Sequence, residues 1–233
     1  MSPEEMLAEQ LRLLTEQNAW LRWYVIATAA IMVATVLQEW FRALLGRVSL
    51  DVEGGAIVTT PMGDPEVTRA HFVRLRVFNR SRWRAARYVE MVLEEASRKT
   101  HASGEYVSGG DINGLNLWWS HVGTALIPQI AAGTVRTADL GHVVRPSDRP
   151  SFPSNAVENK PTADPARTIF KLGAAADPFH RNHLLEPGEW KVVLRLSGAN
   201  VRPRRVEVKM RVVGTWHDDP ADFARDDFSY QVG

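Results

Sequence analysis

A short stretch containing two histidines, "HRNHLLEPGEW", is the first place where this sequence could support chemistry. His180, His183 and Glu186 follow one another at intervals of three residues, so on a helix they would share one face. Two imidazoles and a carboxylate placed in this way could hold a zinc ion. However, "DP" precedes the run and "PG" follows it, and the H-E-x-x-H pattern is absent. We therefore interpret both histidines as solvated loop residues and predict no metal and no cofactor.

Aspartates near the C-terminus are the second candidate, because hard carboxylate oxygens suit calcium. They lie in "TWHDDPADFARDDF" and are Asp218, Asp219, Asp222, Asp226 and Asp227. The spacing, the glycine and the closing glutamate of an EF-hand loop are missing. Asp219 directly before Pro220 instead predicts the N-cap of a short helix. We favour a capped, acidic terminal helix over a calcium site.

Known catalytic patterns are missing from the sequence. It contains no G-x-S-x-G, P-loop or G-x-G-x-x-G pattern, and the lack of cysteine excludes disulfides, thiolate metal sites and a cysteine nucleophile. A net charge of +1 gives no overall attraction to nucleic acid. We predict that the protein is not an enzyme, has no catalytic residues and binds no nucleic acid.

Two stretches are locally basic. Residues 69–99 hold nine Arg and Lys against three acids, and residues 202–211 hold five against one. We interpret both as solvated sheet faces. Contact with anionic lipid headgroups is the alternative that the sequence leaves open.

The apolar stretch near the N-terminus is the element that would position the rest of the chain. No charge occurs from Trp23 to Gln38, and aromatic residues flank the run on both sides: Trp20, Trp23, Tyr24, Trp40 and Phe41. Aromatic rings at both ends of an apolar run are typical of the two membrane–water interfaces. A helix in a soluble core would normally show a polar face, and this run offers only threonines. The pattern predicts a transmembrane helix over residues 20–47.

The segment before this run argues against a cleaved signal peptide, because it is acidic where a signal peptide is basic. We therefore expect a single-pass anchor. Arg12 and Arg22 on one side balance Arg42 and Arg47 on the other. The short acidic tail is easy to translocate, which favours a cytoplasmic C-terminal domain.

A seam with alternating steps of four and three residues, which is typical of a coiled coil, begins in the amphipathic segment 1–19 and continues into the apolar stretch. Its members are Leu7, Leu11, Leu14, Asn18 and Leu21. Asn18 is a polar core position of the kind that sets register and oligomeric state, so a homo-oligomer is expected. The alternative is an amphipathic helix that lies on its own domain or on the membrane surface.

From residue 48 onward the hydrophobic period changes to strict alternation. On residues 69–79, Val73, Leu75 and Val77 share one face while Arg74 and Arg76 share the other. Similar runs predict strands at 48–52, 85–96, 114–120, 134–144, 167–172, 189–198 and 204–216. Alternation with one polar face is typical of antiparallel sheets. The sequence predicts an immunoglobulin-like antiparallel β-sandwich over residues 48–233.

The segments "FVRLRVFNRSRWRAARYVEMVLEE", "LNLWWS", "LEPGEWKVVLRLSGANV" and "VVGTWHDDPADF" occur in this order. In this respect the chain resembles a loose group of uncharacterised bacterial proteins with a short N-terminal membrane helix and an immunoglobulin-like sandwich. The resemblance covers roughly residues 48–227. It implies the fold and the membrane anchor, and it implies no chemistry.

The alternation lapses over residues 141–188, where prolines accumulate. This predicted insertion carries apolar side chains that either pack on the sandwich or contact a partner: Phe152, Ile169, Phe170, Phe179, Leu184 and Leu185. The function expected from these features is a membrane-anchored interaction module, as an accessory or scaffold subunit of a membrane-associated complex. The alternatives are a single-pass sensor whose insertion closes over a ligand, and a metal-dependent enzyme.

Overall fold

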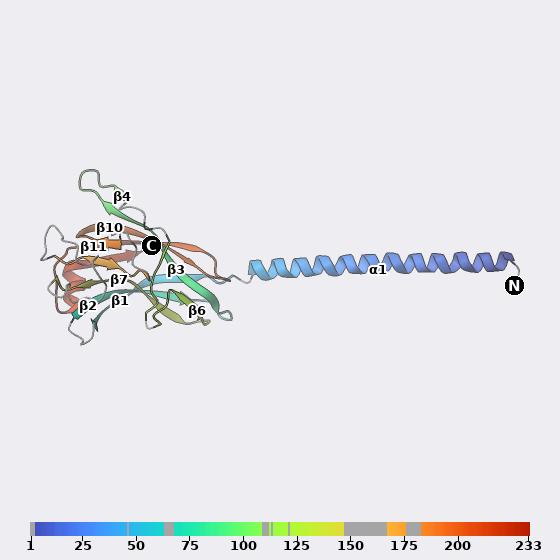
Figure 1. Ribbon diagram of the computed structural model, residues 1–233, viewed down its shortest axis with the longest axis horizontal. Helices are drawn as coiled ribbons and strands as arrows, with labels where there is room; N and C mark the ends of the chain where they lie inside the picture. The colour runs from blue at the N-terminus through green and yellow to red at the C-terminus, as the bar shows by residue number, and fades with distance from the viewer. Residues whose placement is uncertain are drawn as a thin grey trace. The chain divides into compact units, whose positions relative to one another are not determined.

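The computed structural model describes residues 3–45, 47–62, 68–108, 112, 114–120, 122–146, 167–175 and 183–233 (Figure 1). The chain divides into two compact units, Met1–Arg47 and Val48–Gly233, and each is described by itself. The predicted fold class is confirmed. The chain is mainly β, with two antiparallel sheets that follow one long N-terminal helix.

Helix α1 (Pro3–Leu45) is continuous, since no glycine or proline interrupts the sequence after Pro3 until Gly46. Its segment Met6–Gln38 is long and apolar enough to cross a membrane by length and composition. The hydroxyls of Thr28 and Thr35 each donate to the backbone carbonyl four residues earlier, at 2.8 Å. The threonines of the apolar run therefore satisfy their hydroxyls within the helix and need no water.

The first sheet has the strand order β1-β2-β7-β8-β9. Its strands are β1 (Leu50–Met62), β2 (Thr68–Asn79), β7 (Val135–Val144), β8 (Phe170–Leu172) and β9 (Leu184–Leu185). All of its pairings are antiparallel. Val73, Leu75 and Val77 on β2 are completely buried, which confirms the predicted inward face of this strand.

The second sheet has the strand order β12-β11-β10-β3-β4, and β5 and β6 also pair with β3. Its strands are β3 (Ala86–Lys99), β4 (Tyr106–Ser108), β5 (Leu115–Asn116), β6 (Leu126–Ile130), β10 (Gly188–Ser197), β11 (Arg204–Val212) and β12 (Phe228–Val232). β3 could also be read as a helix from its Glu, Met and Leu content. It is a strand, and its Leu93 lies opposite Leu194 of β10.

The inward faces of the two sheets form one hydrophobic core. Leu75 and Phe170 contribute from the first sheet, and Leu93 and Leu194 contribute from the second. Every member of this core lies between Val48 and Phe228. Two antiparallel sheets around a shared core are the architecture of a β-sandwich.

Several predicted boundaries were wrong. The first strand was predicted at 48–52, but β1 continues to Met62, because a bulge between Gly54 and Ile57 lets the pairing with β2 resume. The region 141–188 is not an insertion throughout, since β7 runs to Val144 and β8 and β9 add to the same sheet.

The chain ends differently from the predicted terminal helix. α2 (Pro220–Asp222) continues into the π-helical turn η3 (Phe223–Asp227), and the following residues form β12. The predicted cap is present, because the Asp219 carboxylate accepts a hydrogen bond from the Ala221 amide at 2.8 Å.

Candidate functional site

The aromatic residues predicted to anchor the protein all lie on α1, and all are exposed: Trp20, Trp23, Tyr24, Trp40 and Phe41. The predicted seam residues are exposed as well: Leu7, Leu11, Leu14, Asn18 and Leu21. Helix α1 thus presents apolar side chains that its own chain does not bury. A bilayer or a second helix would remove this surface from water.

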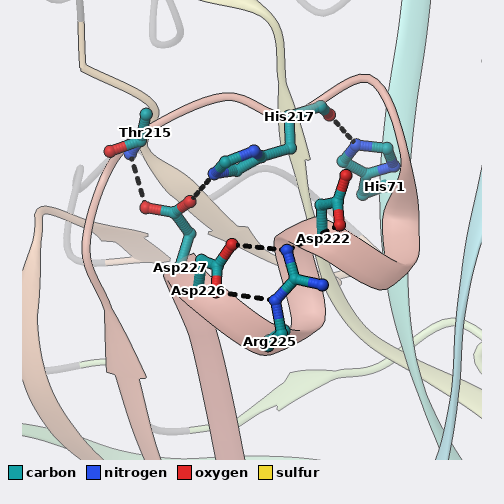
Figure 2. A network of polar contacts seen from close by, with 7 residues as sticks. All are labelled: His71, Thr215, His217, Asp222, Arg225, Asp226 and Asp227. Carbon is teal, nitrogen blue, oxygen red and sulfur yellow. Dashed lines mark hydrogen bonds and ion pairs between the residues drawn. The ribbon is translucent and has the colours of Figure 1, made fainter.

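A cluster of polar side chains joins β2 to the C-terminal turn (Figure 2). His71 of β2 is completely buried, and its Nε2 lies 2.6 Å from the carbonyl oxygen of His217. A carbonyl only accepts, so Nε2 carries the hydrogen and donates it. The Thr59 hydroxyl lies 2.9 Å from Nδ1 and donates to this second nitrogen. Burial lowers the pKa of His71, which keeps the ring neutral near pH 7.

The same cluster continues from His217 to a buried carboxylate. His217 Nε2 is paired with Asp227, which is only 3% exposed and also accepts from the Thr215 amide at 3.3 Å (Figure 2). The His71 ring stacks on Trp216 with 4.3 Å between ring centroids. These contacts fasten residues 215–227 to β2, and the Thr59 hydroxyl ties the His71 ring to β1.

The chemistry of this cluster is that of a structural clasp. Thr59 and His71 form a hydroxyl–imidazole pair, but Nε2 of His71 is held by a carbonyl, and burial encloses the ring. Across the described ranges, no group of three His, Asp or Glu side chains is arranged to hold a metal ion. The aspartates of the predicted terminal helix serve instead as a cap, as the buried Asp227 and as ion-pair partners of Arg225.

Next to the clasp, an open groove of about 510 Å³ lies between strand β1 and the C-terminal segment. Its lining is mostly apolar and consists of Gly55, Ile57, Pro220, Ala221, Ala224, Phe228, Ser229 and Tyr230. Strand β1 is the terminal strand of the first sheet, and β12 is the terminal strand of the second. The groove therefore lies where the edges of the two sheets meet.

Tyr230 of β12 holds the two sheet edges together beside the groove. Its hydroxyl lies 2.6 Å from the carbonyl oxygen of Gly55 and 3.2 Å from that of Arg74. Burial raises the pKa of Tyr230, so the phenol remains protonated and can donate. At Gly55 a Cβ atom would lie only 2.6 Å from the Arg74 carbonyl, so only glycine permits this close approach.

The apolar residues of region 141–188 were predicted either to pack on the sandwich or to contact a partner, and most of those that the structure describes pack on the sandwich. Phe152 and Phe179 lie outside the described residues. Phe170 and Leu185 are completely buried, Ile169 is buried, and Leu184 is half-buried. The described apolar side chains of region 141–188 therefore serve the core rather than an open surface.

The histidine pair is also placed differently. His180 lies outside the described residues. His183 is completely buried, so its interpretation as a solvated loop residue was wrong. The sequence could not show this, because Leu184 and Leu185, which follow His183, form β9 only by pairing with β8.

Sequence reasoning missed His71 and the groove, and it named Asp227 only as one of several aspartates of a terminal helix. His71 and Asp227 are far apart in sequence, so no pattern indicates that they belong to one cluster. Comparison with protein-family models, with curated proteins and with solved structures gave no match for this chain.

Proposed function

We propose that this chain is a single-pass, membrane-anchored interaction module, an accessory or scaffold subunit of a membrane-associated complex that performs no catalysis itself. The observation that carries the proposal is α1, whose uncharged run with aromatic ends is followed within a few residues by a domain with its own core. The acidic N-terminal tail favours a cytoplasmic position for this domain.

The surface best suited to a partner is the groove between β1 and β12. Its apolar lining and the free edge of β1 fit an extended peptide segment, which would add backbone hydrogen bonds along the edge and place side chains in the groove. The clasp of His71 and Asp227 keeps one wall of the groove fixed, which reduces the entropy lost on binding.

Membrane insertion is tested by alkaline carbonate extraction. The full chain should remain with the membrane pellet, and the domain of residues 48–233 should be soluble without detergent. Recovery of the full chain in the carbonate supernatant contradicts the anchor. Single cysteines introduced into this cysteine-free sequence, such as Ala102→Cys, then report the orientation by labelling with an impermeant thiol reagent.

The role of the groove is tested by filling it. Ala224 is exposed and lines the groove, so Ala224→Trp should block a peptide without disturbing the core. Ala102, an exposed residue of the β3–β4 turn, gives the matched control Ala102→Trp. Affinity purification from native membranes should lose the partner with Ala224→Trp and retain it with Ala102→Trp. Equal recovery from both variants places the binding surface elsewhere.

A further inference from the structure

One end of the β-domain contains Val48, the first residue of the domain. The amide of Val48 donates to the Asn200 carbonyl at 2.7 Å, and the Arg202 amide donates to the Val48 carbonyl at 2.9 Å. Three turns lie at this same end: residues 80–85 between β2 and β3, 131–134 between β6 and β7, and 198–203 between β10 and β11. We call this the Val48 end.

The composition of the Val48 end is unusual. Its three turns contain no acidic residue, and they carry Arg80, Arg82, Arg84 and Arg202. Arg80 is occupied by ion pairs with Asp51 and Glu53 of β1, so it adds little net charge. The side chains of Arg82, Arg84 and Arg202 are exposed, and no acid in the three turns offsets their charge.

Trp83 sits in the middle of this basic turn, and it is 88% exposed. No other large hydrophobic residue among those described in the domain is exposed to this degree. Tyr88, just beyond the turn, is 58% exposed and has a φ of +50°, a conformation that is unfavourable for a bulky residue. Exposed aromatic side chains next to arginines form an amphipathic surface.

The turn that carries Trp83 is held rigidly from beneath. The Asn79 side chain is buried, and its Nδ2 donates to the carbonyls of Arg84 at 2.8 Å and Ile130 at 3.0 Å. Nδ2 of Asn200 donates to the Ala85 carbonyl at 2.9 Å. The exposure of Trp83 is therefore a fixed property of the fold and does not come from a loose loop.

We propose that the Val48 end binds the surface of an anionic bilayer, with Trp83 inserted at the interface and Arg82, Arg84 and Arg202 beside lipid phosphates. Tryptophan favours the headgroup level of a membrane, and arginine forms charge-assisted hydrogen bonds with phosphate. The inference rests on the proposed membrane anchor, because the sequence leaves only Gly46 and Arg47 between α1 and Val48. A lipid surface is favoured over a protein partner because this end directly follows the candidate span along the chain.

The test uses the domain of residues 48–233, whose core contains no residue of α1. It should sediment with vesicles of phosphatidylcholine containing about 30% phosphatidylglycerol, and should remain in solution with phosphatidylcholine alone. Salt of about 0.5 M should release it, since screening weakens surface charge. Failure to bind the anionic vesicles, or equal binding to both vesicle types, overturns the inference.

Variants identify the surface responsible. Arg82→Ala and Arg84→Ala should each weaken the binding of anionic vesicles by about fivefold, and Trp83→Ser should abolish insertion as measured by quenching with brominated lipid. Arg211→Ala is the matched control, because Arg211 is exposed near the opposite end of the same sheet, and it should bind like the wild type. If Arg211→Ala weakens binding as much as Arg82→Ala, the interaction is unspecific and the Val48 end has no special role.

Vesicle binding and carbonate extraction test the lipid-binding end and the membrane anchor separately. If the full chain stays in the membrane pellet after carbonate extraction while the domain does not bind anionic vesicles, the anchor stands and the lipid-binding end is rejected. If carbonate releases the full chain while the domain still binds anionic vesicles, the anchor is rejected and the lipid-binding end stands.

Discussion

Trp216 and Trp83 lie in segments at opposite ends of the β-domain, and their surroundings differ completely. Trp216 stacks on His71, and the Arg145 guanidinium lies 5.7 Å from its ring centroid. Trp83 is 88% exposed, although the backbone around it is just as well bonded. Around Trp216 the hydrogen bonds of the segment accompany a packed side chain. Around Trp83 they support a side chain that lies in solvent. Exposure of an aromatic residue therefore need not indicate a poorly ordered segment.

The two ends also differ in their acidic residues. Segments at the end that contains Trp216 carry the acids Glu105, Glu186, Asp218 and Asp219, of which Glu186 and Asp218 are paired with arginines, whereas the three turns of the Val48 end carry no acid. The end with packed aromatics is therefore suited to water, and the end with exposed aromatics is suited to an anionic surface.

The largest expected difference between the ends concerns stability. Phe223 is buried beneath the clasp, with its ring 5.1 Å from that of His71, so Phe223→Ala should lower the free energy of unfolding by about 3–5 kcal/mol. Trp83→Ala should change it by less than about 0.5 kcal/mol. Urea unfolding of both variants measures the contrast. A comparable loss in the two variants would show that Trp83 packs against the domain in solution.

A smaller effect is expected from the support of the Trp83 turn. Asn79→Ala removes three hydrogen bonds at a buried position and should cost about 2–3 kcal/mol. Asn200→Ala, at a less buried position, should cost less. Both variants should also weaken vesicle binding, since the turn loses its fixed shape. Retention of full vesicle binding in both would mean that the rigidity of this turn is irrelevant to lipid contact.

The clasp should make the stability of the domain depend on pH. Because burial lowers the pKa of His71, the unfolded chain takes up the proton more readily than the folded one. The hydrogen bond to the His217 carbonyl and the charge of Asp219 raise this pKa, and the charge of the His217 ring lowers it, each more weakly than burial does. The stabilising contribution is complete above the ordinary histidine pKa of about 6.5 and is lost as the pH falls through the lower folded value. Urea midpoints should therefore fall between about pH 7.5 and pH 5.5, and His71→Gln should flatten this decline.

The smallest effect should be a gain in stability. Tyr88 holds a positive φ that asparagine tolerates better, so Tyr88→Asn should raise the free energy of unfolding by roughly 1 kcal/mol. Thermal melting should then shift upward by about 2–4 °C. A decrease instead would indicate that the tyrosine ring makes contacts that outweigh its backbone strain.

The long strands were predictable because their alternation records which face is buried. Val73, Leu75 and Val77 indicate the inward face of β2 without any knowledge of its neighbours. The short strands β4, β6 and β12 were missed, since three to five residues are too few to show a period. β12 was further hidden by the capped turn directly before it, whose aspartates suggested a longer helix.

The polar clasp and the Val48 end could not be predicted. His71 and His217 meet only because β2 and the segment after β11 come together at one end of the sandwich. The basic turn around Trp83 was visible in sequence, but the burial of its supporting Asn79 was not, because an asparagine in a turn is usually solvated. In both cases the missing information is the pairing of strands distant in sequence.

The pairing of β3 with β10 has a consequence for synthesis of the protein. Leu93 lies opposite Leu194, so about a hundred residues must be made after β3 before its central partner exists. Until then β3 has only the short strands β4, β5 and β6 beside it, and one edge of a fourteen-residue strand stays open. Open edges of this kind recruit other chains, and non-local pairing slows folding. Insertion of α1 into a membrane, as proposed above, would hold nascent chains apart during this interval.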